Sequence, residues 1–388
     1  MCLFPQTMSR VAICGVARTP IGKFRGSLAN LTAVELGIRS VKELLSRCNI
    51  NPESGVIDEV LFGQVLQAGA GQAPARQVAL GAGLPNSIAA TTINKVCGSS
   101  LKAAMIGANS IRSGEYKAII AGGMESMTNA PKFEKRTGEE KEMVSTMVHD
   151  GLWDVYNDVH MGNTGEIVAT ECNISREKMD AFAARSQNKA AKAEENGWFD
   201  WERFSMPELS IDEGVRPGTT PEKLAELRAV FQEDGMVTAG NASTLNDGAS
   251  SILIADEDFA IEQGWEIIAF IEDYCTAGVE PHRVMYAPVP AIKMLLERSN
   301  LDVMDIDVYE HNEAFASASC AVAQEVGIPE ERFNLHGGAV ALGHPLGSSG
   351  TRCLITMLGV MRRLNAKSGI VSLCLGGGNA VAMRVSMN

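Results

Sequence analysis

The second half of this 388-residue chain repeats the first half in three blocks that keep one order. LLSRCNINPESGVIDEVLFGQV at 44–65 is similar to LLERSNLDVMDIDVYEHNEAF at 295–315, GSSLKAAMIGANSI at 98–111 to GSSGTRCLITMLGV at 347–360, and AIIAGGMES at 118–126 to GIVSLCLGGGNA at 369–380. Each match alone is weak, but three matches in one order indicate duplication of one structural unit. We therefore predict two similar halves, with a site where related turns of the halves face each other.

Strand-like and helix-like segments alternate within the first half. Buried strands are predicted at 11–16, 58–65, 91–96 and 118–121, and helices at 33–47 and 99–111. The helix at 33–47 is indicated by apolar residues at helical spacing. This alternation is typical of an α/β fold with buried strands.

The middle of the chain departs from this alternation. Residues from about 124 to 170 are rich in Met, charged and turn-forming residues, and a helix is predicted at 176–196, with Ser175 as its N-cap and Gly197 as its stop. We predict a loop-rich, helical domain at 123–245. It is inserted into an N-terminal half formed by 1–122 and 246–266, and the C-terminal half follows at 267–388.

Composition narrows the classes of partner. The net charge of −13 disfavours nucleic acid or an anionic membrane surface. The nine Cys are scattered without a CxxC pair and the six His show no HExxH-like spacing, so we expect neither a disulfide framework nor a metal. The N-terminus lacks the pattern of a signal or transit peptide, and no apolar run is long enough to span a bilayer. A cytoplasmic protein is expected.

Cys97 lies in NKVCGSSLKAA, between a predicted strand and a predicted helix. A thiol at a helix N-terminus feels the positive end of the helix dipole, which lowers its pKa and favours the nucleophilic thiolate. Gly98 allows a substrate to approach the backbone closely. The alternative is a structural cysteine, since cysteine is among the residues most often buried.

His344 and Asn312 occupy turns of the second half. His344 lies in the glycine-rich segment HGGAVALGHPLGSSGTR, with Pro345 placed as the first residue of a helix. A histidine in such a turn can act as a base, and the alternative is a histidine that caps a loop. Asn312 follows a strand in YEHNEAFA, where open α/β folds often place catalytic groups, but it also fits the N-cap of a helix beginning at Glu313.

Cys374 ends the apolar strand of GIVSLCLGGGNA, and three glycines follow it. The N–H groups of such a turn can point at an anion, which is the geometry of an oxyanion hole. The alternative is a core cysteine before a glycine turn.

The four motifs NKVCGSSLKA, HNEAFA, GGAVALGHPLGSSGTR and LCLGGGNA are far more specific in combination than singly. In this combination the chain resembles the thiolase family. The resemblance covers essentially the whole chain and includes VARTPIGKFRGSL, GGMESMTNAP, DGLWDVYNDVHMGNTGE and VTAGNASTLNDGA. It implies the thiolase fold, in which two similar βαβαβαββ halves form an αβαβα layered core with an inserted loop and helical lobe.

The resemblance also implies roles for these residues. Cys97 is the nucleophile that becomes acylated, His344 takes its proton, and Cys374 is the acid and base at the α-carbon. Asn312 holds a water that stabilises an enolate oxygen together with His344, and the backbone N–H groups of Cys97 and Gly376 form a second oxyanion hole. A Claisen condensation needs these groups: a nucleophile that carries the acyl group, a base that removes the α-proton, and two sites that stabilise negatively charged oxygens.

In this family the inserted lobe binds coenzyme A. By resemblance the contacts are carried over to Leu152, His160, Met161, Arg216 and Ser243. A guanidinium at Arg216 suits the nucleotide end, although a solvated surface arginine is the alternative. Ser243 is expected along the pantetheine arm, and Trp153 and Tyr156 are expected in the core. Coenzyme A thioesters are substrates here, and no permanently bound cofactor is expected.

The implied reaction is the reversible condensation of two acetyl-CoA to acetoacetyl-CoA and CoA, by a ping-pong mechanism through acetyl-Cys97. DGLWDVYNDVHMGNT resembles the short-chain biosynthetic branch of the family. The sequence departs from the common family pattern at Lys132, Gly165, Pro217, Asn379 and Ala380. None of these changes removes a catalytic group, but Asn379 is expected near the site, where it would influence the preferred acyl chain.

Other functions remain open at this point. One is a broad-range 3-ketoacyl-CoA thiolase of fatty-acid degradation. Ketoacyl synthases and hydroxymethylglutaryl-CoA synthases share a Cys and a His but lack a second Cys before GGG together with NEAF, so Cys374 argues against them. A non-catalytic CoA-binding protein is disfavoured because Cys97, Asn312, His344 and Cys374 are all present. The resemblance further implies a homo-oligomer, a dimer or tetramer.

Overall fold

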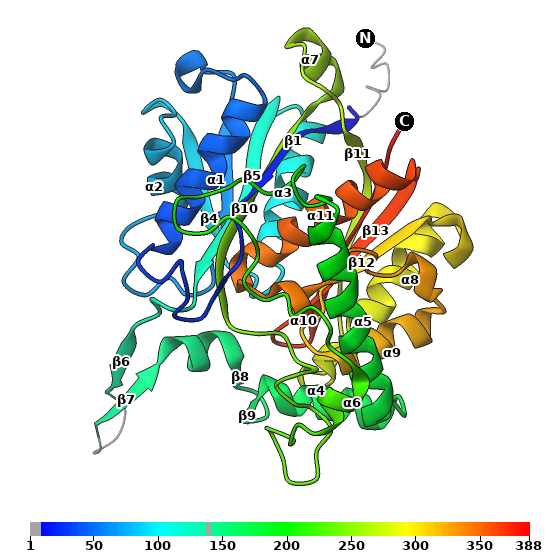
Figure 1. Cartoon of the computed structure of the whole chain (residues 1–388). Coiled ribbons are helices and arrows are strands. Elements are labelled where there is room, and N and C mark those ends of the chain that lie inside the picture. Colours follow the sequence, from blue (N-terminus) through cyan, green and yellow to red (C-terminus); the bar gives the residue numbers. More distant parts are fainter. Residues whose placement is uncertain (1–8, 137–140) are drawn as a thin grey trace.

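The computed structural model describes residues 9–136 and 141–388, so the targeting expectation for the first residues falls largely outside the described residues. In this part of the chain ten strands form one mixed sheet in the order β12-β13-β14-β11-β1-β10-β5-β3-β4, with β2 paired to β10 (Figure 1). Their bounds are β1 (Val11–Arg18), β2 (Gly22–Lys23), β3 (Glu59–Gly63), β4 (Ala89–Ile93), β5 (Ala118–Ser126), β10 (Asn246–Asp256), β11 (Ala269–Gly278), β12 (Val308–His311), β13 (Ser368–Leu375) and β14 (Asn379–Ser386).

The strand order is nearly symmetric about the pair of β1 and β11, which are antiparallel to each other. On one side β10 is antiparallel to β1 and β5, and β5 is parallel to β3. On the other side β14 is antiparallel to β11 and β13, and β13 is parallel to β12. The halves therefore share one strand arrangement, as the repeated sequence blocks predict.

The helices and the two halves of the sheet form five alternating layers. Two helices pack against each other in the middle, between the two halves of the sheet (Figure 1). Two further pairs cover the outer faces of the first and second half. The central helices are α3 (Ser99–Arg112) and α11 (Ser349–Leu364), and the outer ones are α1 (Ala33–Arg47), α2 (Pro74–Gly81), α8 (Pro288–Ser299) and α9 (Ala316–Val326).

Side chains along each strand alternate between these layers. In β5, Ile119 and Ala121 point into the central core, whereas Ile120 and Met124 point into the outer one. This two-residue period is that of a strand buried on both faces. The αβαβα arrangement predicted for the chain is confirmed.

Local signals explain where the helices begin. Thr32 Oγ1 accepts a hydrogen bond from the Glu35 N–H at 3.2 Å, and the Glu35 carboxylate accepts one from the Thr32 N–H at 2.8 Å. This capping box starts α1 at the predicted position. Ser175 caps α5 (Arg176–Glu195) by accepting from the Lys178 N–H at 3.3 Å, as predicted.

The inserted lobe lies between β5 and β10. These strands pair from Ala118↔Ala255 to Ser126↔Asp247, so the lobe leaves and re-enters the sheet at neighbouring positions. Its elements are β6 (Lys132–Lys135), β7 (Glu142–Ser145), η2 (Met147–Leu152), β8 (Trp153–Asp154), β9 (Val159–His160), α4 (Met161–Glu171), α5 and α6 (Pro221–Ala225). The proposed domain limits remain a prediction.

β5 is longer than predicted, because it continues through two glycines to Ser126. A Cβ at Gly123 would lie 2.0 Å from the Gly347 carbonyl oxygen, so only glycine allows the turn of the second half to approach the strand. The glycine pair therefore marks a contact between the halves and not the end of the strand.

The remaining short elements connect these layers. They are η1 (Pro52–Ser54), α7 (Glu257–Glu262), η3 (Pro281–Tyr286), η4 (Val303–Asp305), η5 (Glu330–Arg332), α10 (Ala339–Leu342) and η6 (Leu346–Ser348). Among the described residues, no helix has the length and apolar character needed to cross a membrane.

Candidate active site

Cys97 lies in a tight turn between the end of β4 and the start of α3, as predicted. Ser99 Oγ accepts from the Lys95 N–H at 2.8 Å and donates to the Val96 carbonyl at 2.6 Å, which closes the turn. A Cβ at Gly98 would lie 2.5 Å from the Leu375 side chain. Glycine at 98 therefore lets β13 of the other half pack directly against the Cys97 turn.

His344 is held by the turn between α10 and η6. Its N–H donates to Asn246 Oδ1 at 2.9 Å. The expectation that Pro345 begins a helix is wrong, because the 3₁₀ helix η6 starts at Leu346 and α11 only at Ser349. Pro345 precedes this helical turn, and its carbonyl accepts from Ser349 Oγ at 2.9 Å.

The hydrogen bonds around His344 assign its tautomer. The Ser349 hydroxyl has one hydrogen, which is donated to Pro345, so its oxygen accepts from His344 Nδ1–H at 2.6 Å. Nε2 then carries the lone pair and lies 3.3 Å from Asn312 Nδ2, which donates to it. Nε2 is therefore the acceptor nitrogen of the ring, as the predicted role of a base requires.

Asn312 follows β12 directly, and its N–H donates to the Ser372 carbonyl at 3.0 Å. The alternative reading as a helix N-cap is wrong, because α9 begins at Ala316 with Phe315 in the cap position. Asn312 is fully buried behind His344 and contacts the imidazole directly. Its position supports the predicted pairing of these two residues.

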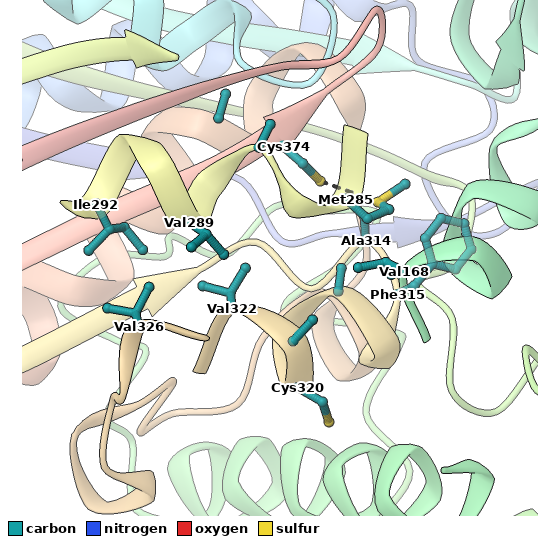
Figure 2. Close-up of a cluster of buried hydrophobic side chains, with 14 of the residues drawn as sticks. Val168, Met285, Val289, Ile292, Ala314, Phe315, Cys320, Val322, Val326 and Cys374 are labelled. Atoms are coloured by element: carbon teal, nitrogen blue, oxygen red, sulfur yellow. Dashed lines mark hydrogen bonds between the residues drawn. The ribbon is translucent and has the colours of Figure 1, made fainter. Parts of the chain in front are cut away.

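Cys374 lies near the end of β13, and the glycine turn follows it. Its Sγ is 3.6 Å from Met285 Sδ, and Figure 2 shows its side chain directed at Met285, beside the apolar cluster of the second half. The backbone N–H groups of Cys97 and Gly376 both act on the Cys97 sulfur in the direction that lowers its pKa. These are the two donors that the sequence predicts for an oxyanion hole.

Burial sets the protonation of the three titratable groups. Burial, followed by the neighbouring Cys374, raises the pKa of the Cys97 thiol above its usual value, although the N–H groups of Cys97 and Gly376 act in the opposite direction. In the free enzyme, desolvation therefore outweighs the lowering of this pKa that is expected at a helix N-terminus. Burial raises the pKa of Cys374 to about 12. Burial, with a smaller effect of Arg352, lowers the pKa of His344 to about 3. The resting site is neutral.

One cavity of about 770 Å³ brings most of the predicted residues together, whereas Asn312 lies outside its lining and contacts it through His344. Cys97, His344, Cys374 and Gly376 line it. All the residues carried over as coenzyme A contacts also line it, namely Leu152, His160, Met161, Arg216 and Ser243. The inserted lobe supplies these walls, so the cavity lies between the lobe and the two halves.

Three cationic side chains line the cavity, although the whole chain is acidic. They are Arg216, which is exposed, and Lys23 and Lys223, which sequence reasoning missed. Among the described residues, no carboxylate lines this cavity. The local charge therefore favours an anionic ligand.

The wall near the lobe is aromatic. His160 Nδ1 accepts from the Gly162 N–H at 3.0 Å, and its ring stacks on Phe231 with 4.8 Å between centroids. The core reading of Trp153 and Tyr156 is wrong, because Tyr156 is 69% exposed and Trp153 is only partly buried. Both lie in or beside the short β8–β9 hairpin, whose few strand pairs leave them at the surface.

Asn379 lies outside the cavity and contacts the segment that leads to Cys97. Its Oδ1 accepts from Lys95 Nζ at 3.1 Å, two residues before Cys97. Asn379 therefore contacts the turn that carries Cys97, and it is not part of the cavity wall.

Four buried residues that sequence reasoning did not single out support this site. Their motifs were visible, but their contacts become apparent only in three dimensions. Asn246 anchors the His344 backbone, Ser349 fixes its tautomer, Cys353 contacts Asn312, and Glu125 accepts from the Gly347 N–H at 2.9 Å.

Comparison with known proteins defines the class. The thiolase N-terminal domain family matches residues 11–258 and the thiolase C-terminal domain family matches residues 265–387. The chain belongs to the thiolase family and is an acyltransferase.

Individual relatives are similar over nearly the whole chain. The acetyl-CoA acetyltransferase of Cupriavidus necator is 46% identical over 97% of this chain and 99% of its own. The crystal structure of the Acat5 thiolase from Ascaris suum in complex with coenzyme A is 38% identical, with a TM-score of 0.93, and covers 98% of this chain and 100% of its own. Human mitochondrial 3-ketoacyl-CoA thiolase in complex with CoA is 35% identical, with a TM-score of 0.94 and 98% of each chain covered.

Proposed function

We propose that this acyltransferase is an acetyl-CoA C-acetyltransferase, which interconverts two acetyl-CoA with acetoacetyl-CoA and CoA. The observation that carries the proposal is one cavity lined by two cysteines, a neutral histidine whose Nε2 is the acceptor nitrogen, and two backbone N–H groups that act on the Cys97 sulfur. The 46% identity to an acetyl-CoA acetyltransferase supports the acetyl substrate.

Acyl transfer to the enzyme comes first. Cys97 Sγ attacks the thioester carbonyl of acetyl-CoA while His344 Nε2 takes the thiol proton. The N–H groups of Cys97 and Gly376 hold the developing oxyanion. The C–S bond to CoA breaks, and the CoA thiolate leaves with the proton of Cys374. Acetyl-Cys97 then faces a charged pair, imidazolium His344 and thiolate Cys374.

Carbon–carbon bond formation returns these protons. The Cys374 thiolate takes an α-proton from a second acetyl-CoA, and a thiolate of so high a pKa is a strong base. His344, now protonated, donates from Nε2 to the enolate oxygen, and the Asn312 side chain lies beside it. The enolate carbon attacks the acetyl carbonyl, the bond to Cys97 breaks, and the Cys97 thiolate recovers its proton from His344. Acetoacetyl-CoA leaves, and the reverse sequence is thiolysis.

The cationic side chains are proposed to bind the phosphates of coenzyme A. Arg216, Lys23 and Lys223 line the cavity, as do Ser243 and the stacked pair of His160 and Phe231. We propose that Ser243 and this pair contact the part of coenzyme A between its phosphates and the reacting thioester. Guanidinium and ammonium groups are the usual phosphate partners.

A broad-range 3-ketoacyl-CoA thiolase of fatty-acid degradation is the second candidate. The observation in its favour is the apolar cavity wall, which could accept a longer acyl chain and includes Met127, Met147, Leu245 and Leu346. Thiolysis of acetoacetyl-CoA, 3-ketohexanoyl-CoA and 3-ketodecanoyl-CoA distinguishes the candidates. Activity confined to acetoacetyl-CoA supports the first. Equal or better activity on the longer substrates supports the second. No thiolysis of any substrate contradicts both.

We also propose a cytoplasmic homo-oligomer, a dimer or tetramer. β4 pairs with β3 alone among the described strands, so one of its edges is open to another copy. The β6–β7 hairpin extends away from the body of the molecule (Figure 1), and Met143 on it is 60% exposed. A reactive thiol pair at the site fits a reducing compartment. Light scattering coupled to gel filtration tests the oligomer, and a monomer would contradict it.

A further inference from the structure

Cys353 lies on α11 behind the active site and is completely buried in the central layer. Its Sγ is 3.7 Å from Asn312 Oδ1, within the longer range of a sulfur hydrogen bond. The residue does not reach the cavity, and the steps proposed above do not use it. Its contact with the reaction therefore passes through Asn312.

The direction of this hydrogen bond follows from chemistry. Burial raises the pKa of the Cys353 thiol to about 12, so the sulfur keeps its hydrogen and is a donor. The carbonyl oxygen of Asn312 is the acceptor that this hydrogen can reach. The Asn312 amide is then oriented with Nδ2 toward His344 Nε2, at 3.3 Å.

The hydrogen bonds of Ser349 and His344 favour the same orientation of the Asn312 amide. Ser349 donates to Pro345 and accepts from His344 Nδ1, which leaves a lone pair on Nε2. A flipped Asn312 amide would place Oδ1 against this lone pair and its NH₂ group against a thiol hydrogen. Both ends therefore oppose the flip.

We propose that Cys353 is a positioning residue for the acyl-transfer reaction, because its thiol fixes the Asn312 amide so that a donor faces His344 Nε2. The inference rests on the proposed function of Asn312 and His344. A purely structural role is the alternative, since Cys353 is also surrounded by the apolar side chains of the central core.

A matched pair of variants separates the two roles. Cys353→Thr keeps a hydroxyl donor, whereas Cys353→Val has nearly the same shape and no donor. Both add the same volume and the same β-branching to α11, so their packing costs are similar. We expect kcat for acetoacetyl-CoA thiolysis to be about three- to tenfold lower in Cys353→Val than in Cys353→Thr, the effect of losing one neutral hydrogen bond. KM should agree within about twofold, because no cavity contact changes.

Three outcomes decide the matter. A lower kcat in Cys353→Val with Cys353→Thr closer to wild type, at similar melting temperatures, supports the positioning role. Equal kcat values in the two variants overturn it, whether both equal wild type or both fall with stability. If the wild-type enzyme itself shows no thiolysis, the proposed function fails and not the role of Cys353 alone. Cys353→Ser against Cys353→Ala repeats the comparison should the larger side chains prevent folding.

Discussion

The Arg18 guanidinium donates from Nη1 and Nη2 to the two carboxylate oxygens of Asp212, at 2.8 and 2.9 Å. Nε of the same group donates to Glu202 at 2.7 Å, and the three side chains are at most 1% exposed. Arg18 lies on β1 of the first half, whereas both carboxylates belong to the inserted lobe. Buried ion pairs thus attach the inserted lobe, which lines the cavity, to the sheet.

Removal of Arg18 should therefore destabilise the protein strongly. In Arg18→Met, two buried carboxylates lose their main partner, and we expect a loss of about 3–5 kcal/mol in the free energy of unfolding. The exposed pair of Arg39 and Glu208 provides the control, and Arg39→Met should cost less than about 1 kcal/mol. Denaturant titrations at one protein concentration measure both. Equal losses in the free energy of unfolding would show that the buried ion pairs of Arg18 stabilise the protein no more than the pair at the surface.

Alkylation of Cys97 should depend on pH in a way that reflects its burial. Because burial and Cys374 raise the pKa of this thiol, the free enzyme holds it as the neutral form at pH 7. The rate of carboxamidomethylation by iodoacetamide should then rise about tenfold for each pH unit across the neutral range, without a plateau. Peptide mapping assigns the modified cysteine. A plateau beginning near pH 6 would instead indicate a resting thiolate–imidazolium pair.

The cationic wall should contribute to binding and not to chemistry. For Arg216→Gln we expect KM for coenzyme A to rise about three- to tenfold with kcat nearly unchanged, the pattern of a lost uniform binding contact. The difference should vanish with an acetylated pantetheine that lacks the nucleotide phosphates. Lys42→Gln, on exposed α1 surface outside the cavity, is the control. An unchanged KM in Arg216→Gln would place the phosphates elsewhere.

The sequence predicts the architecture well because its signals are local and repeated. Apolar residues at helical spacing predict α1 with its observed bounds, and three repeated blocks predict the symmetric sheet. Cys97, His344, Cys374 and Gly376 lie in turns at element ends, where motifs are short and continuous. All four line one cavity, as expected from residues of two facing halves.

What the sequence predicts poorly depends on long-range contacts. A helix N-terminus favours the Cys97 thiolate, but the desolvation that outweighs it comes from residues far away in sequence. The sequence predicts too early an end for β5, because Gly122 and Gly123 resemble a strand stop, whereas Gly123 accommodates the turn at Gly347. Cys353 gave no signal among the scattered cysteines, and only the fold places it against Asn312.

In the proposed reaction Cys97 carries the acyl group, and Cys374 transfers the proton at the α-carbon. The most direct measurement is mass spectrometry of Cys374→Ser after brief incubation with acetyl-CoA and acid quenching, with Cys97→Ser alongside. We predict an acetyl group on the Cys97 peptide of Cys374→Ser, no acetylation of Cys97→Ser, and carbon–carbon chemistry slowed at least about a hundredfold in Cys374→Ser. Acetylation at another cysteine, or normal thiolysis by Cys97→Ser, would contradict the account.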